Sequence, residues 1–193
     1  LIRWDAAPEL PGMETFARQL GEAGVLASAG HTDATADETL RGFDWGFSHM
    51  THFFCAMSAR RKRDGRVVAG AVEAGLLRDG VTLEVIADGR HVPRESLLLA
   101  LKVKGADGVC LVSDAMRAAG TDARESYLGQ PGKGTPVIIE DGVAKLPDRS
   151  FYAGSVASGD RMLRVAHLEY GVPLPEAVRM MTLTPARLAG AVR

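Results

Sequence analysis

The chain has 193 residues, a formal net charge of -1, 46% hydrophobic residues and 24% charged residues. This composition is ordinary for a globular protein; it gives no general attraction for nucleic acid, and no apolar run approaches the roughly 18 residues of a membrane helix. The two cysteines form no CxxC pair, which suits a reducing compartment, so we expect a cytoplasmic protein with no nucleic-acid or membrane partner.

Short apolar runs alternate with amphipathic stretches up to Asp114, a pattern typical of βα units. Strands are expected at residues 1–4, 25–30, 47–51, 82–87 and 109–113. Helices are expected at residues 8–21, 35–45, 67–77 and 93–103, the second of them opened by a capping box of Thr35 and Glu38. A closed barrel of this type has about eight strands, so we predict an α/β fold that is a partial (β/α)8 TIM-type barrel, about its last five strands.

The pattern changes after Asp114. Residues 136–146 predict a hairpin whose turn is Asp141-Gly142, and we expect a β-hairpin insertion near residues 127–148, lying over the mouth of the barrel. Further helices are expected at 158–170 and 174–181, and another at Thr184-Pro185.

His31, His52 and Asp114 each follow a different apolar run. Parallel strands followed by helices bring such residues to one mouth, and imidazole nitrogens with a carboxylate oxygen are ligands for zinc or iron. The three residues therefore predict a metallohydrolase site. The competing interpretations are histidines packed against backbone carbonyls and, for Asp114, a helix N-cap. His49 has the opposite strand parity from His52, so we interpret it as a packing or surface residue.

Three further segments are candidates for ligand contact. His91, in the loop Asp88-Gly89-Arg90-His91, is either a hydrogen-bond donor to a substrate oxygen or a solvated loop histidine. The basic loop of residues 60–66 is typical of a phosphate clamp or a solvated charge run. A nucleic-acid patch is the third and weakest interpretation. Ala153-Gly154-Ser155 is typical of a tight turn, and Asp33 is a candidate hydrogen-bond acceptor behind a ligand or a helix cap.

The chain contains, in this order, Ala7-Pro8-Glu9, Gly30-His31-Thr32-Asp33-Ala34-Thr35, Thr51-His52 with Ala56-Met57, Ala87-Asp88-Gly89-Arg90-His91-Val92, Leu111-Val112-Ser113-Asp114-Ala115, Ala153-Gly154-Ser155 and Leu183-Thr184-Pro185-Ala186-Arg187. Together these segments resemble the N-acetylglucosamine-6-phosphate deacetylase family of the amidohydrolase superfamily. The resemblance implies metal-dependent hydrolysis of the acetamide of N-acetylglucosamine 6-phosphate, giving glucosamine 6-phosphate and acetate.

The resemblance also implies roles for individual residues. His31, His52 and Asp114 match the metal site, which takes one or two divalent ions, Zn2+ or Fe2+, and Asp114 and His91 match the catalytic residues. Arg63 matches an arginine that reaches the substrate phosphate in the neighbouring subunit, so a homodimer acting on a small amino-sugar phosphate is expected. The segments matching substrate contacts comprise Cys55, Ala56, Arg63, Asp88, Gly89, Arg90, His91, Tyr152, Ala153 and Gly154.

The chain departs from the family pattern in three ways. The family's metal-binding glutamate and its β-sandwich strands have no counterpart, so residues 1–193 are expected to form one incomplete barrel domain that lacks the first strands. Cys55 stands where the family usually has asparagine, and Arg63-Asp64-Gly65-Arg66 matches the phosphate segment only in part. These departures leave two alternatives open: an amidohydrolase acting on a different N-acyl or cyclic amide, and a non-catalytic sugar-phosphate-binding relative.

Overall fold

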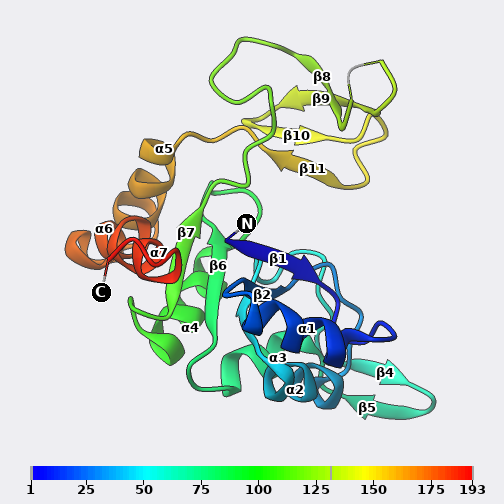
Figure 1. The fold of residues 1–193 in the computed structure, drawn as a ribbon. Coiled ribbons are helices and arrows are strands. Elements are labelled where there is room, and N and C mark those ends of the chain that lie inside the picture. The colour runs from blue at the N-terminus through cyan, green and yellow to red at the C-terminus, as the bar shows by residue number, and fades with distance from the viewer. Residues whose placement is uncertain (1, 131, 193) are drawn as a thin grey trace.

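A five-stranded parallel sheet forms the centre of the computed structural model, which describes residues 2–130 and 132–192 (Figure 1). In sheet order its strands are β1 (Arg3–Ala6), β2 (Leu26–Ala29), β3 (Phe47–Met50), β6 (Thr82–Ile86) and β7 (Val109–Val112). Because every neighbouring pair is parallel, the carboxyl ends of all five strands lie along one edge. The expected α/β fold with a parallel sheet is confirmed; the part of the first predicted strand at Leu1 lies outside the described residues.

Helices pack against this sheet and share one apolar core with it. They are α1 (Met13–Glu22), α2 (Ala36–Trp45), α3 (Ala71–Leu77), α4 (Arg94–Lys104) and α6 (Leu174–Met181). The side chains of Phe47, Met50, Phe53, Leu83 and Leu97 are each at most 2% exposed. Burial of side chains this large is the main stabilising contribution to the sheet that carries the site.

The predicted capping box opens α2. The Thr35 hydroxyl accepts from the Glu38 N–H at 3.3 Å, and the Glu38 carboxylate accepts from the Thr35 N–H at 2.7 Å. Two N–H groups at the helix start are satisfied in this way. The cap therefore sets the start of α2, a few residues after His31.

Two helices begin later than predicted. Residues 8–12 form turns before α1, and Leu10 is 52% exposed, so it does not lie on an apolar face of a helix as the predicted range 8–21 would require. Helix α3 begins at Ala71 because the residues before it form β5 (Arg66–Val68), which pairs with β4 (Arg61–Arg63). The basic segment is therefore a two-stranded hairpin and not a loop.

A second, antiparallel sheet follows β7. Its order is β11-β10-β9-β8, from β8 (Glu125–Leu128), β9 (Thr135–Glu140), β10 (Val143–Lys145) and β11 (Tyr152–Ser155). The predicted hairpin is its β9–β10 pair, turned at Asp141 and Gly142, whose φ values are 54° and 76°. The predicted two-stranded hairpin was too short, because β8 and β11 extend it to a sheet of four strands. Ala153-Gly154-Ser155 is part of β11 and not a turn. Figure 1 shows this sheet apart from the parallel sheet, beyond the end of β7.

The chain then returns to the parallel sheet through helices. The stretch predicted as one helix at 158–170 is α5 (Gly159–Arg164) followed by the π-helical turn η1 (Val165–Glu169). The last helix, α7 (Leu183–Leu188), begins one residue before Thr184, whose hydroxyl donates to the Ala106 carbonyl at 2.7 Å instead of capping the helix. No helix in the two described ranges is long and apolar enough to cross a membrane.

Candidate active site

His31, His52 and Asp114 line one cavity of about 810 Å³ at the carboxyl edge of the parallel sheet. Each lies two residues beyond the end of its strand, β2, β3 or β7. The two imidazole rings meet edge to face with centroids 4.4 Å apart. The topology thus brings together three side chains that are far apart in the sequence, as predicted.

The backbone at this cavity is strained. His31, His52 and Asp114 have φ values of 46°, 33° and 47°, and Phe54 and Ala56 in the same wall have 75° and 48°. A non-glycine residue held in this left-handed region costs about 1–3 kcal/mol, and such residues cluster at ligand sites. Five strained residues at one cavity are therefore independent support for a functional site there.

Both imidazoles keep a nitrogen lone pair for a ligand. The Nδ1–H of His52 donates to the Cys55 carbonyl at 3.1 Å, so Nε2 is the free nitrogen. Burial lowers the pKa of His31, the nearby His52 lowers it further, and Asp114 and Asp5 act in the opposite direction. The net direction favours a neutral His31 ring, the form that coordinates a cation.

The donor set of two imidazoles and a carboxylate fits a divalent cation in chemical type. The fit is incomplete, however. Within residues 2–130 and 132–192, no three histidine, cysteine, aspartate or glutamate side chains are grouped closely enough to hold a metal ion. The three side chains thus share one cavity but do not by themselves form a closed cation site.

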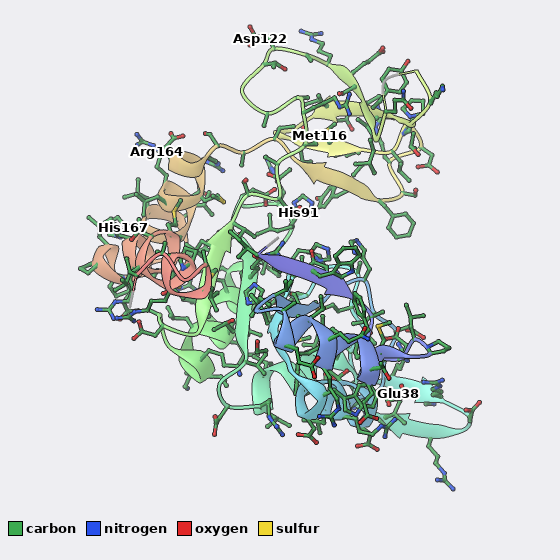
Figure 2. The ribbon with its side chains drawn as sticks, in the orientation of Figure 1. Glu38, His91, Met116, Asp122, Arg164 and His167 are labelled. Atoms are coloured by element: carbon green, nitrogen blue, oxygen red, sulfur yellow. The ribbon has the colours of Figure 1, made fainter. Side chains whose placement is uncertain are left out.

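His91 enters the same cavity from the segment after β6. Figure 2 shows it between the parallel sheet and the antiparallel sheet. Its Nδ1 lies 2.7 Å from Oδ2 of Asp88, and its ring centroid is 5.1 Å from that of Tyr152. The structure therefore favours a site residue over a solvated loop histidine.

Asp88 does not line the cavity, although its segment matches substrate contacts. Its side chain is buried behind His91 and also accepts the backbone N–H groups of Arg90 and His91 at 2.8 and 2.9 Å. Burial raises the pKa of Asp88, but these hydrogen bonds outweigh it and hold the pKa below its usual value. Gly89 and Arg90 are also outside the cavity wall; Arg90 Nε donates to the Asp141 carbonyl at 2.8 Å and so joins the loop to the antiparallel sheet.

The rest of the wall divides into predicted and unpredicted residues. Cys55, Ala56, Tyr152, Ala153 and Gly154 were predicted and do line the cavity. The sequence analysis missed an apolar set that comprises Phe54, Ile86, Ala115, Met116, Leu128 and Phe151. Phe54 was findable, because it lies between two predicted site residues. Ile86 and Ala115 were findable too, because Ile86 lies in the predicted strand before Asp88 and Ala115 directly follows Asp114. The rest depend on where the antiparallel sheet folds back, which no local pattern reveals.

This chain is similar in sequence to curated proteins and in structure to solved ones. No family model matches the chain. A curated relative from Lysinibacillus sphaericus, N-acetylglucosamine-6-phosphate deacetylase, is 34% identical over 181 residues, which are 94% of this chain and 44% of that protein. A solved deacetylase structure from Mycobacterium smegmatis, in complex with N-acetyl-D-glucosamine-6-phosphate, matches 98% of this chain at 32% identity and a TM-score of 0.89. This chain is related to the amino-sugar 6-phosphate deacetylases. It spans 49% of the M. smegmatis chain.

The deacetylase relatives differ in the sugar they are named for. A relative from Shewanella sp. (strain ANA-3), N-acetylgalactosamine-6-phosphate deacetylase, is 33% identical over 180 residues, covering 93% of this chain and 43% of that protein. The identity to the two kinds of deacetylase is therefore nearly equal.

Several residues matched to the deacetylases lie outside the cavity. Arg63, on β4, has Nη1 3.7 Å from the Glu38 carboxylate and does not line the cavity of its own chain. Asp33 pairs with Arg61, and α2 is capped by Thr35 instead. His49 is 1% exposed, bonded to Thr82 and Glu84, which confirms it as a packing residue.

The thiol of Cys55, where the deacetylase family usually has asparagine, is expected to be unreactive. Burial, with smaller contributions from the nearby Asp114 and Asp88, raises its pKa to about 11. Since the thiolate is the reactive form, alkylation of Cys55 by iodoacetamide near pH 8 is expected to be roughly a hundredfold slower than in the denatured chain. Mass spectrometry of a Cys110→Ala variant measures this rate at Cys55 alone. Equal rates in the folded and denatured chains would contradict the expectation.

Proposed function

We propose that the protein hydrolyses the acetamide of an N-acetylamino-sugar 6-phosphate, releasing acetate and the free amino sugar 6-phosphate. The observation that carries the proposal is the meeting of His31, His52, His91 and Asp114 in one cavity at the carboxyl edge of a parallel sheet. The names of the relatives supply the substrate class. The five parallel strands with their packed helices support the finer fold, part of a (β/α)8 barrel.

The proposed chemistry assigns one task to each residue. His31 and His52 would hold a divalent cation, which supplies Lewis-acid polarisation and makes water more acidic. Asp114 takes a proton from the attacking water as its oxygen bonds to the amide carbon. The carbonyl oxygen gains negative charge, and His91 stabilises it by hydrogen bonding. Asp114 then gives the proton to the amine nitrogen as the C–N bond breaks, leaving acetate and an amine.

Zinc binding tests the assignment of the two imidazoles without any turnover. His31→Gln is expected to weaken Zn2+ binding by at least about tenfold, or 1.4 kcal/mol, in isothermal titration calorimetry, because it removes a nitrogen ligand. His167→Gln is the matched control. His167 lies on η1, away from the cavity, and its Nδ1 is bonded to the Val172 carbonyl. Equal Zn2+ affinities for the two variants and the unmodified chain would reject the assignment.

The substrate is tested by acetate release from four sugars: N-acetylglucosamine 6-phosphate, its galactosamine counterpart, and each sugar without phosphate. The glucosamine compound is the substrate we propose, and the relatives named for N-acetylgalactosamine 6-phosphate make the second the specific alternative. A phosphate requirement would support the proposed class. Cleavage of unphosphorylated amides alone would indicate a different amidohydrolase, and binding without cleavage a non-catalytic relative.

The phosphate contact and the assembly belong to the same proposal. Arg63 lies on the β4–β5 hairpin with Lys62 and Arg66 and does not reach its own cavity, which supports a homodimer in which it serves the neighbouring subunit. Both cysteines are free, in keeping with the expected reducing cytoplasm.

A further inference from the structure

Asp88, the residue behind His91, makes hydrogen bonds that its sequence motif does not predict. Asp88 is 3% exposed and directly follows the end of β6 and Ala87. One carboxylate oxygen, Oδ1, accepts two backbone N–H groups, from Arg90 at 2.8 Å and from His91 at 2.9 Å. The other oxygen, Oδ2, lies 2.7 Å from Nδ1 of the His91 ring. The carboxylate is therefore held by the loop that it organises.

The chemistry of this pair decides which ring nitrogen carries hydrogen. The pKa of Asp88 is held below its usual value, so near neutral pH the carboxylate is ionised and can only accept hydrogen bonds. The contact with Oδ2 then requires a hydrogen on Nδ1 of His91. Among the described residues, Nε2 of His91 has no hydrogen-bond partner. Every fully buried side-chain nitrogen or oxygen in those residues does have a partner, so Nε2 is not fully buried. Nε2 is therefore open to the cavity that His91 lines.

We propose that Asp88 is a positioning residue that holds His91 in the Nδ1–H tautomer with Nε2 turned to the substrate. A neutral His91 ring then offers the substrate only an acceptor, and it donates to a carbonyl oxygen only as the imidazolium. The stabilisation of the oxyanion in the proposed function therefore requires a cationic ring, for which Asp88 is the buried counter-charge. This last step rests on the proposed function, whereas the tautomer does not.

The tautomer is measured directly by long-range 1H–15N NMR of the unmodified 193-residue chain, with the His91 signals assigned by their loss in a His91→Gln variant. At a pH above the titration of the ring, seen in the same spectra, we expect the hydrogen on Nδ1 and a bare Nε2. This measurement needs neither substrate nor metal, so a failure of the proposed function would not affect it. A hydrogen on Nε2 in the unmodified chain would overturn the proposal.

Asp88→Asn makes the test sharper. The amide oxygen can keep both backbone N–H bonds, which places the amide NH2 opposite Nδ1 of His91. Because NH2 only donates, Nδ1 must become an acceptor, and the hydrogen is expected to move to Nε2. Asp148→Asn is the matched control, since Asp148 accepts the Ser150 N–H in an exposed turn. The control is expected to leave His91 unchanged. Retention of the Nδ1–H tautomer in a folded Asp88→Asn variant would overturn the proposal.

Discussion

Asp114→Asn is expected to lower the rate of acetate release by about 10²–10⁴-fold, because an amide cannot accept the proton of the attacking water or pass it to the leaving amine. Asparagine is nearly isosteric with aspartate and tolerates the left-handed backbone that Asp114 adopts, with φ 47°. The fold and the cavity wall are therefore expected to survive the change. The measurement is kcat with N-acetylglucosamine 6-phosphate, alongside circular dichroism to verify folding.

The chain offers a close control for this variant in Asp141→Asn. Asp141 also has a positive φ, 54°, but it lies in the exposed β9–β10 turn, and its carboxylate pairs with Lys145. The same chemical change at a similar backbone conformation is expected to leave kcat within about twofold, since an exposed ion pair contributes little. Wild-type turnover by Asp114→Asn would remove Asp114 from the proton transfer.

Phe53→Ala is expected to lower the free energy of unfolding by about 3–5 kcal/mol. Phe53 is fully buried in the main core, and its N–H donates to the Glu84 carbonyl at 2.6 Å, so it links the His52 segment to β6. Truncation removes most of the ring's apolar contact and leaves a cavity directly below the site. Urea unfolding followed by circular dichroism measures the change.

The matched control for the core variant is Phe151→Ala, which deletes the same atoms from a side chain that is 72% exposed. Its unfolding free energy is expected to stay within about 0.5 kcal/mol of the unmodified chain. A similar loss of stability in both variants would show that burial of Phe53 is not what stabilises the site.

Local patterns predicted most of the parallel sheet and its helices. The capping residues Thr35 and Glu38 and the turn at Asp141-Gly142 act through neighbours in the sequence, so they were predicted correctly. One error occurs where strand pairing overrides an apparent helical periodicity. Val67 and Val68 fit a helical face, yet they pair with Lys62 and Arg61 in a hairpin.

In the candidate site, too, some features follow from the local sequence and others only from the structure. The sequence by itself determined the types of group, two imidazoles, a carboxylate and the His91 loop, because each follows an apolar run that had to become a strand. Only the structure decided that Asp88 lies behind His91 and that Arg63 lies outside its own cavity. It alone also brought Leu128 and Phe151 to the wall. The physical reason differs between the two levels. The fold of the loop after β6 places Asp88 against His91. The packing of the antiparallel sheet beyond β7, which depends on side chains distant in the sequence, brings Leu128 and Phe151 to the wall, and no local pattern contains it.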